Sequence, residues 1–224
     1  MNVKRLFAGA PATAALCVAC VVIFVVTAAQ AGSLTNAIWG SRLGTQMVLY
    51  GPFVTSEPFG WLRMFAAGFA HVDATHVAVN VVMLALVAAE VERFVGTAAF
   101  VPAYVAGLAG SAAAVLAFNF DTPTVGASGA LYMLMVVLIA VAYRRQTDLR
   151  APFALLSLNV LYSLLASGVS LWGHLGGLAV GVVLAAPLTS DRSAVRVAAA
   201  GTAAGVAVVL STLYPQDFPG LLPV

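Results

Sequence analysis

Ser128 and His174 are the two residues of this sequence whose types and surroundings could do chemistry together. Ser128 lies in the Gly-Ala-Ser-Gly segment 126–129 and His174 in the Gly-His-Leu-Gly-Gly segment 173–177, and each segment opens an apolar run. A serine hydroxyl is a weak nucleophile until a neighbouring base accepts its proton, and His174 is the only histidine on the later runs that could do so. The sequence therefore predicts covalent catalysis, with Ser128 as nucleophile and His174 as base.

Such a site must also stabilise the negative charge that develops on the attacked carbonyl oxygen. Because Ser128 begins a helix, its backbone N–H has no intrahelical acceptor and can point at this oxyanion. His76 and Asn80 lie four residues apart, on one face of an earlier helix, and would add side-chain donors. These three residues are the predicted oxyanion hole.

The surroundings of His174 favour a Ser-His dyad over a triad. No acidic residue is available to orient the imidazole, because Asp73 and Asp121 fall in loops. Tyr132 follows Ser128 by four residues and so shares its helix face, where the phenol ring could pack against the imidazole and hold it. We therefore expect an aromatic side chain to position the base.

The elements that carry these residues are membrane-spanning helices. Hydrophobic residues make up 62% of the 224 residues and charged residues 8%, which is too little charge to cover the surface of a soluble domain. Crossing a bilayer core takes about 20 apolar residues. The runs are apolar on every face, which argues against strands. We predict an all-α, single-domain chain (1–224) with an external loop at 33–74 and seven helices, at about 11–31, 75–92, 98–118, 128–143, 152–169, 173–189 and 194–213.

Lys and Arg residues indicate how the chain is oriented. Eight of the ten fall at one set of helix ends, namely Lys4, Arg5, Arg93, Arg144, Arg145, Arg150, Arg192 and Arg196. Positive residues accumulate on the cytoplasmic side, so we expect a cytoplasmic N-terminus, with the 33–74 loop and the tail from Tyr214 outside. The Ala, Val and Gly content suggests a prokaryotic plasma membrane, and the net charge of +2 indicates no nucleic-acid partner.

The candidate residues lie at one depth in the membrane. His76, Ser128 and His174 are each 16 or 17 residues from a charged residue at the other end of the same run. At about 1.5 Å per residue this is roughly 24–26 Å, which places all three several Å below the outer surface of a core about 30 Å thick. Polar chemistry gathered at one level of an apolar chain indicates a functional site.

Glycines explain how two of the helices could come close. Gly173, Gly177 and Gly181 recur every four residues and would form a stripe of small residues facing Gly126, Gly129 and Ala130. Close approach is what a short hydrogen bond between Ser128 and His174 needs.

The N-terminal run has a second interpretation. Lys4-Arg5, the apolar core and Ala29-Gln30-Ala31 together are typical of a secretory signal, but the run is longer than the usual core of about 7–15 residues, which favours a membrane helix. Cys17 and Cys20, on one face of this run, are expected to pack as small apolar residues.

Taken together, these residues resemble the rhomboid family of intramembrane serine proteases over most of the chain. The resemblance runs through Trp61, Leu62, Arg63, His71, His76, Asn80, Glu92, Gly96, the segment 126–129, Tyr132, His174, Gly177 and Gly181. It implies a six-helix rhomboid core, here with one additional C-terminal helix, and Ser128 as nucleophile, His174 as base, and His76 with Asn80 in the oxyanion hole. Supporting positions are Tyr132, Gly126, Gly129, Gly177 and His71.

The resemblance also implies an activity, which is cleavage of a transmembrane protein substrate near the outer membrane face. It implies a partly helical 33–74 loop in the membrane interface and structural use of Arg63 and Glu92, while His71 is expected to hydrogen-bond within the loop. No metal or organic cofactor is expected, and the partners are the substrate and the lipid bilayer. Trp61 departs from the family pattern, because it stands two residues before Arg63 where many relatives have the two adjacent.

Two other functions stay open at this point. A non-catalytic rhomboid-like protein could bind transmembrane helices, although such relatives usually lack the serine or the histidine and both are present here. A small transporter would be expected to carry intramembrane charges or an inverted repeat, and neither is visible. The sequence carries no feature that sets the substrate, the oligomeric state or the role of the seventh helix.

Overall fold

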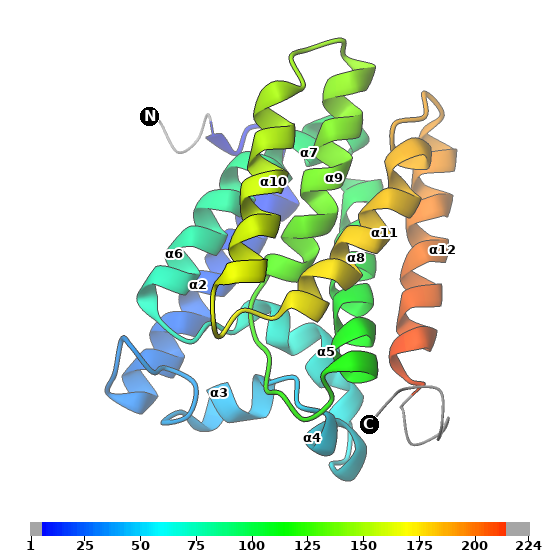
Figure 1. Ribbon diagram of the computed structural model, residues 1–224. Helices are drawn as coiled ribbons and strands as arrows, with labels where there is room; N and C mark the ends of the chain where they lie inside the picture. Colours follow the sequence, from blue (N-terminus) through cyan, green and yellow to red (C-terminus); the bar gives the residue numbers. More distant parts are fainter. Residues whose placement is uncertain (1–5, 214–224) are drawn as a thin grey trace.

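The computed structural model describes residues 6–213, and these residues form a bundle of helices (Figure 1). Within this range there is no strand, only an isolated pairing of Leu49 with Thr124. The prediction of an all-α, polytopic membrane protein is confirmed. Lys4 and Arg5, used above for orientation, and the tail from Tyr214 lie outside the described residues.

The bundle is built from seven apolar helical segments. They are α2 (Pro11–Ala31), α6 (Ala74–Met83) continued through a π-helical turn (Leu84–Ala88) into α7 (Ala89–Val95), α8 (Thr97–Phe118), α9 (Ser128–Arg144), α10 (Arg150–Leu165), α11 (Leu171–Leu188) and α12 (Ser193–Ser211). Five are long and apolar enough to cross a membrane, while α9 and α10 are shorter, at 17 and 16 residues. The helix expected at 152–169 ends at Leu165, because the chain turns extended at Ala166 and Gly168 takes a positive φ of 79°.

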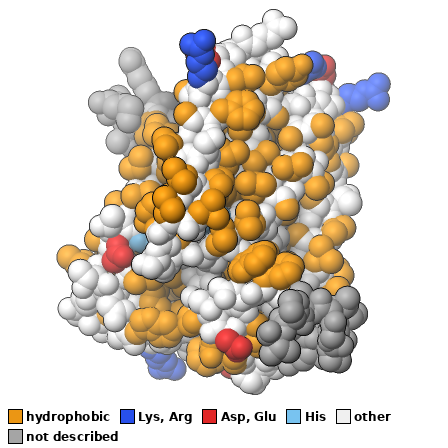
Figure 2. Space-filling view, viewed as in Figure 1, with side chains coloured by type: hydrophobic (Ala, Val, Ile, Leu, Met, Phe, Trp, Pro, Cys, Tyr) orange, Lys and Arg blue, Asp and Glu red, His pale blue; other side chains and the backbone are white. Residues whose placement is uncertain are grey.

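Charged side chains gather at the two ends of the bundle and apolar ones cover the face between them (Figure 2). We call the end covered by residues 33–74 the loop end and the opposite one the far end. At the far end Arg145 pairs with Glu90, and Arg144 pairs with Asp191. This distribution is the one expected of a bundle whose middle lies in hydrocarbon.

The 33–74 segment forms a short-helix layer across the loop end (Figure 1). Its helices are α3 (Arg42–Met47), α4 (Gly51–Ser56) and α5 (Arg63–Ala66), with 3₁₀ turns at Gly60–Leu62 and Ala67–Phe69. The buried Arg63 guanidinium donates to the carbonyls of Thr45 (2.8 Å) and Val48 (3.0 Å) and pairs with Glu57, so one side chain ties three parts of the layer together. Trp61 is half exposed and meets the Phe65 ring edge to face.

Small residues let the central helices approach closely. α8 lies at the centre and packs against α9, α11 and α12. A Cβ on Gly177 of α11 would overlap the carbonyl oxygen of Gly129 in α9, and one on Gly181 would lie 2.8 Å from the carbonyl oxygen of Met133. Backbone therefore meets backbone along the α9–α11 contact, which is how helices without a hydrophobic driving force gain packing energy in a membrane.

Glu92 joins the start of α2 to the α7–α8 connection at the far end. The carboxylate is fully buried and accepts four hydrogen bonds, from the Ala12 and Thr13 amides (3.0 and 2.8 Å) and from the Thr13 and Thr97 hydroxyls (2.7 Å each). Because α2 has no side-chain cap of its own, Glu92 supplies the acceptors that its first turn lacks.

Glu92→Ala is expected to lower the free energy of unfolding by about 3–5 kcal/mol, since four donors would lose their acceptor in a buried place. Thermal unfolding of the purified protein in detergent measures the loss. Glu90→Gln is the control, because Glu90 lies two residues away on α7, in a partly exposed ion-pair cluster with Arg93 and Arg145. This change should alter stability by less than about 1 kcal/mol. Equal melting temperatures for the two variants would contradict the capping role.

Candidate active site

The candidate residues meet where four helices come together near the loop end. α6, α9 and α11 all start there, with His76, Ser128 and His174 in their first turns. α10 ends there, with Ser163 in its last turn (Figure 1). Residues from distant parts of the chain therefore converge at one level of the bundle.

Ser128 and His174 are in direct contact. The Ser128 Oγ lies 2.7 Å from Nε2 of His174, within the range of a short hydrogen bond between a hydroxyl and a ring nitrogen. His174 is buried and Ser128 is partly exposed, so the imidazole is shielded from solvent while the hydroxyl stays accessible. The Gly177–Gly129 approach places the two helix starts at this separation.

The Tyr132 ring lies flat against the His174 imidazole. The ring centroids are 4.2 Å apart and the planes differ by 9°. The stack restricts rotation of the imidazole about its χ angles, and the buried phenol is held in turn by a hydrogen bond to Ser163. Tyr132 can thus keep Nε2 aimed at Ser128.

Ser163 is a site residue that the sequence analysis missed. Its hydroxyl lies 2.8 Å from Nδ1 of His174, on the side of the ring away from Ser128. The signal that could have found it is the pair Asn159 and Ser163, which place two polar side chains one turn apart in an apolar helix. His174 therefore has a hydrogen-bond partner on each ring nitrogen.

His76 and Gly126 border the space beside Ser128. A Cβ built on Gly126 would lie 2.7 Å from Nε2 of His76 and 3.7 Å from Oγ of Ser128, so both polar atoms face the same small volume. Asp73, expected in a loop, caps α6 by accepting from the His76 amide at 2.8 Å and holds that helix start in place. Nε2 of His76 thus borders the same small space as the Ser128 hydroxyl.

Asn80 is buried one turn deeper on α6. Its Nδ2 donates to the His76 carbonyl at 2.9 Å, which leaves the second hydrogen of that amide group available. Its Oδ1 has no partner among the residues that the structure describes. Asn80 can therefore offer one donor and not two.

His71 is fully buried in the loop layer, next to His76, with the two ring centroids 4.9 Å apart. Burial, reinforced by the neighbouring His76, lowers the pKa of His71 to about 3. The ring is therefore neutral at physiological pH, and Nδ1 lies 3.2 Å from the Phe69 carbonyl oxygen as its donor. His71 contacts the loop backbone and His76 but not Ser128.

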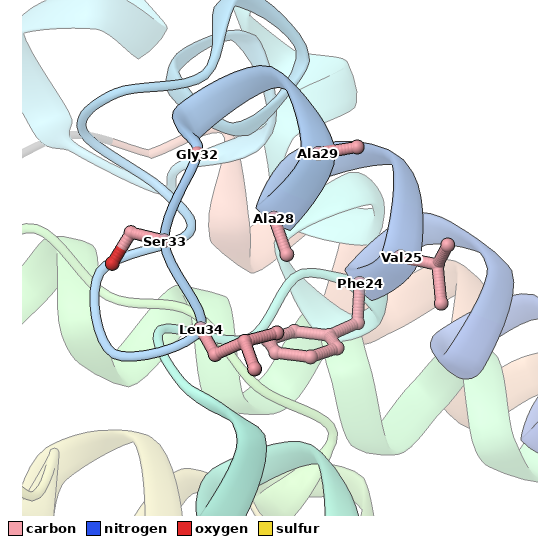
Figure 3. A pocket seen from close by; sticks show the side chains of 7 residues that line it. All are labelled: Phe24, Val25, Ala28, Ala29, Gly32, Ser33 and Leu34. Carbon is pink, nitrogen blue, oxygen red and sulfur yellow. The ribbon is translucent and has the colours of Figure 1, made fainter.

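Residues 6–213 contain no cluster of three His, Cys, Asp or Glu side chains that could hold a metal ion. Figure 3 shows an apolar hollow at the end of α2, where the ring of Phe24 and the side chain of Leu34 lie together. Ser33 is its one polar lining residue, and no titratable group faces it. The candidate catalytic side chains lie at the four-helix junction and not in this hollow.

Gly126→Ala is expected to lower kcat for any reaction at Ser128 by about 10- to 100-fold. The new Cβ would press on the His76 ring, and φ of 122° is strained for alanine. Gly32→Ala is the control, because Gly32 also has a positive φ (62°) but an added Cβ would meet nothing within 4 Å. Equal kinetic losses in the two variants would assign the effect to backbone strain and not to His76.

The chain has relatives among known proteins. A sequence model of the rhomboid domain matches residues 58–191, from the loop layer to the end of α11. The protein YdcA of Bacillus subtilis (strain 168) is 31% identical over 149 residues, which cover 62% of this chain and 75% of YdcA. Rhomboid protease GluP of the same organism is 31% identical over 57% of this chain, and Rhomboid-related protein 3 of Homo sapiens is 25% identical over 73%.

The matches to the last two relatives cover 26% and 45% of their lengths, so this chain is compared with only part of each. The family match itself spans more than half of this chain and contains every residue of the four-helix junction. A helical membrane bundle in which His76, Ser128 and His174 meet near the loop end agrees with that match. The chain belongs to the rhomboid family.

Proposed function

We propose that this protein is an intramembrane serine endopeptidase that cleaves transmembrane-helix substrates by a Ser128–His174 dyad. The observation that carries the proposal is the 2.7 Å contact between Ser128 Oγ and His174 Nε2 inside an apolar helix bundle of the rhomboid family. Polar side chains inside a membrane bundle are costly to bury, and such groups mark functional sites. The family's protease-named relatives support the same reaction class.

Acylation begins when Nε2 of His174 accepts the Ser128 proton. The Oγ attacks the carbonyl carbon of the scissile peptide bond, the C–O bond forms, and the carbonyl electron pair moves onto its oxygen. The resulting imidazolium then donates its Nε2 proton to the amide nitrogen as the C–N bond breaks. The products of this half-reaction are a free amine and an acyl ester on Ser128.

The oxyanion formed in that step needs donors placed in advance. The Ser128 amide has no intrahelical acceptor and lies at the positive end of the α9 dipole. His76 Nε2 and the free Nδ2 hydrogen of Asn80 are the further donors we assign to the hole. Water that enters from the loop end then attacks the ester carbonyl carbon while Nε2 of His174 accepts a proton from it. The bond between that carbon and Ser128 Oγ breaks, His174 returns the proton to Oγ, and the new C-terminal carboxylic acid is released.

The substrate would be a membrane helix that can unwind at the level of the loop end, because a peptide bond inside a helix is shielded by its own hydrogen bonds. Among the described residues the Arg side chains favour a cytoplasmic far end, with only Arg42 and Arg63 at the loop end. The loop end would then face outside. We place the protein in a plasma membrane as a multi-pass protein, with a prokaryotic membrane as the expected source.

The test is cleavage of a single-span model substrate by the purified protein in liposomes, with the cut bond mapped by mass spectrometry. We expect cleavage at a bond near the loop-end interface, faster when a helix-breaking residue such as proline is placed beside it. Binding without cleavage, across substrates with intact and with destabilised helix ends, would overturn the proposal. That result would assign the chain to the non-catalytic helix binders instead.

A further inference from the structure

Ser163 occupies the position where a catalytic triad has its acid. It is the only buried residue of α10, on a helix whose other side chains are partly or fully exposed. Its hydroxyl contacts three groups, which are Nδ1 of His174 (2.8 Å), the Tyr132 hydroxyl and the backbone carbonyl of Asn159 (2.9 Å). One small side chain therefore links α10 to both the base and the ring stacked on it.

The roles in this group of hydrogen bonds can be assigned by counting protons. A serine hydroxyl has one proton to donate and two lone pairs that accept. The Asn159 carbonyl can only accept, so the Ser163 proton goes there. Both remaining partners must then donate to the Ser163 oxygen, which makes Tyr132 a donor through O–H and His174 a donor through Nδ1–H.

This assignment sets the state of the base. A neutral imidazole carries one proton, so a proton on Nδ1 leaves Nε2 with the lone pair that Ser128 needs. We infer that Ser163 is a second positioning residue of the site, beside Tyr132. Because its own proton is donated to the Asn159 carbonyl, Ser163 accepts from His174 and holds it in the Nδ1–H tautomer. The inference rests on the proposed function for its kinetic consequence but not for the hydrogen bond itself.

The same bond serves the charged intermediate. When His174 takes the Ser128 proton, both ring nitrogens carry hydrogen, and Nδ1–H then donates to an oxygen whose own proton is committed to a carbonyl. A hydroxyl polarised in this way accepts more strongly than a free one. Ser163 thus accepts the Nδ1–H hydrogen bond with a neutral oxygen, as a carboxylate does in a triad. No charge has to be buried in the membrane for this.

The first experiment reads the tautomer directly and needs no activity. His174 in protein with ¹⁵N-labelled histidine is assigned by its loss in His174→Ala, since the chain has three histidines. The measurement uses a Ser128→Ala background, in which Ser128 no longer influences Nε2. We expect Nδ1–H alone when Ser163 is present and a mixture of both tautomers in Ser128→Ala/Ser163→Ala. An unchanged tautomer in the double variant would overturn the inference.

The second experiment measures turnover of the single-span substrate. Ser163→Ala should lower kcat by roughly 10- to 30-fold, as expected for one hydrogen bond to a charged group, and leave KM within about twofold. Ser163→Thr keeps the hydroxyl and should recover most of kcat. Ser157→Ala, an exposed serine on the same helix, is the matched control and should match wild type.

The results of these two experiments distinguish the proposed protease function from the proposed positioning role of Ser163. An inert wild type with a Ser163-dependent tautomer would reject the protease function and keep the hydrogen bond. An active wild type whose kcat is unchanged in Ser163→Ala would keep the protease and reject the positioning role. If Ser163→Ala does not fold, the tautomer of the Ser128→Ala protein still decides, because Nε2–H there would contradict the assigned hydrogen bonds.

Discussion

Ser128→Ala and His174→Ala are each expected to lower kcat/KM by at least about 10⁴-fold, to the floor of the assay. Alanine at 128 removes the atom that attacks, and alanine at 174 leaves Ser128 Oγ without the acceptor that now lies 2.7 Å away. Cleavage of the single-span substrate in liposomes measures kcat/KM for both variants. No other hydroxyl is in contact with Nε2 of His174 among the described residues, so no substitute nucleophile is in place.

The two losses should not add. A nucleophile and its base act as one unit, so the double variant Ser128→Ala/His174→Ala is expected to match either single variant. Thermal stability should stay within about 1 kcal/mol of wild type for Ser128→Ala, because this side chain is partly exposed. Ser157→Ala controls for removal of a hydroxyl elsewhere. Substantial cleavage by Ser128→Ala would refute the nucleophile assignment.

Gly177→Val is expected to lower kcat by about 100-fold or more and to destabilise the protein by about 1–3 kcal/mol. The added Cβ would overlap the Gly129 carbonyl oxygen, so α11 must move away from α9. That movement lengthens the Ser128–His174 contact, because both residues lie in the first turns of these helices. Kinetics on the model substrate and thermal unfolding in detergent measure the two effects.

Gly201→Val on α12 is the matched control for that variant. It makes the same change in a membrane helix, at a position where an added Cβ meets no atom within 4 Å. We expect activity close to wild type, since only a small change in helix propensity remains. If Gly177→Val kept full activity, the close α9–α11 approach would not be needed for the site.

The sequence was sufficient for the class of fold because apolar run length is a local property. A stretch such as Thr97–Phe118 has to cross the membrane whatever its neighbours do, and its backbone can satisfy its own hydrogen bonds only as a helix. The residue at which α10 ends could not be predicted in the same way. Val169 belongs to the apolar composition of the run, but the turn at Ala166 to Gly168 ends the helix earlier, and composition does not report backbone turns.

Residue types and their common depth were also readable from the sequence. Ser128, His174 and His76 lie at the starts of parallel helices, so counting residues from charged helix ends brings them to one level. Their depth follows from helix rise, but their mutual distance depends on how each helix is rotated about its axis. The 2.7 Å contact between Ser128 and His174 therefore comes from the packed bundle.

Tertiary structure alone decided the partner of Nδ1. Neither acid of the neighbouring loops is hydrogen-bonded to His174, because Asp73 caps α6 and Asp121 is exposed. Ser163, a neutral residue on another helix, fills the place because α10 packs with its last turn against Tyr132 and His174. A serine in an apolar helix usually bonds its own backbone, and Ser163 does so too, through Asn159. Only the packing of α10 brings the same oxygen within 2.8 Å of Nδ1 of His174. Contacts between helices depend on how each helix is rotated and how closely it approaches its neighbour, and residue spacing along the chain does not specify either.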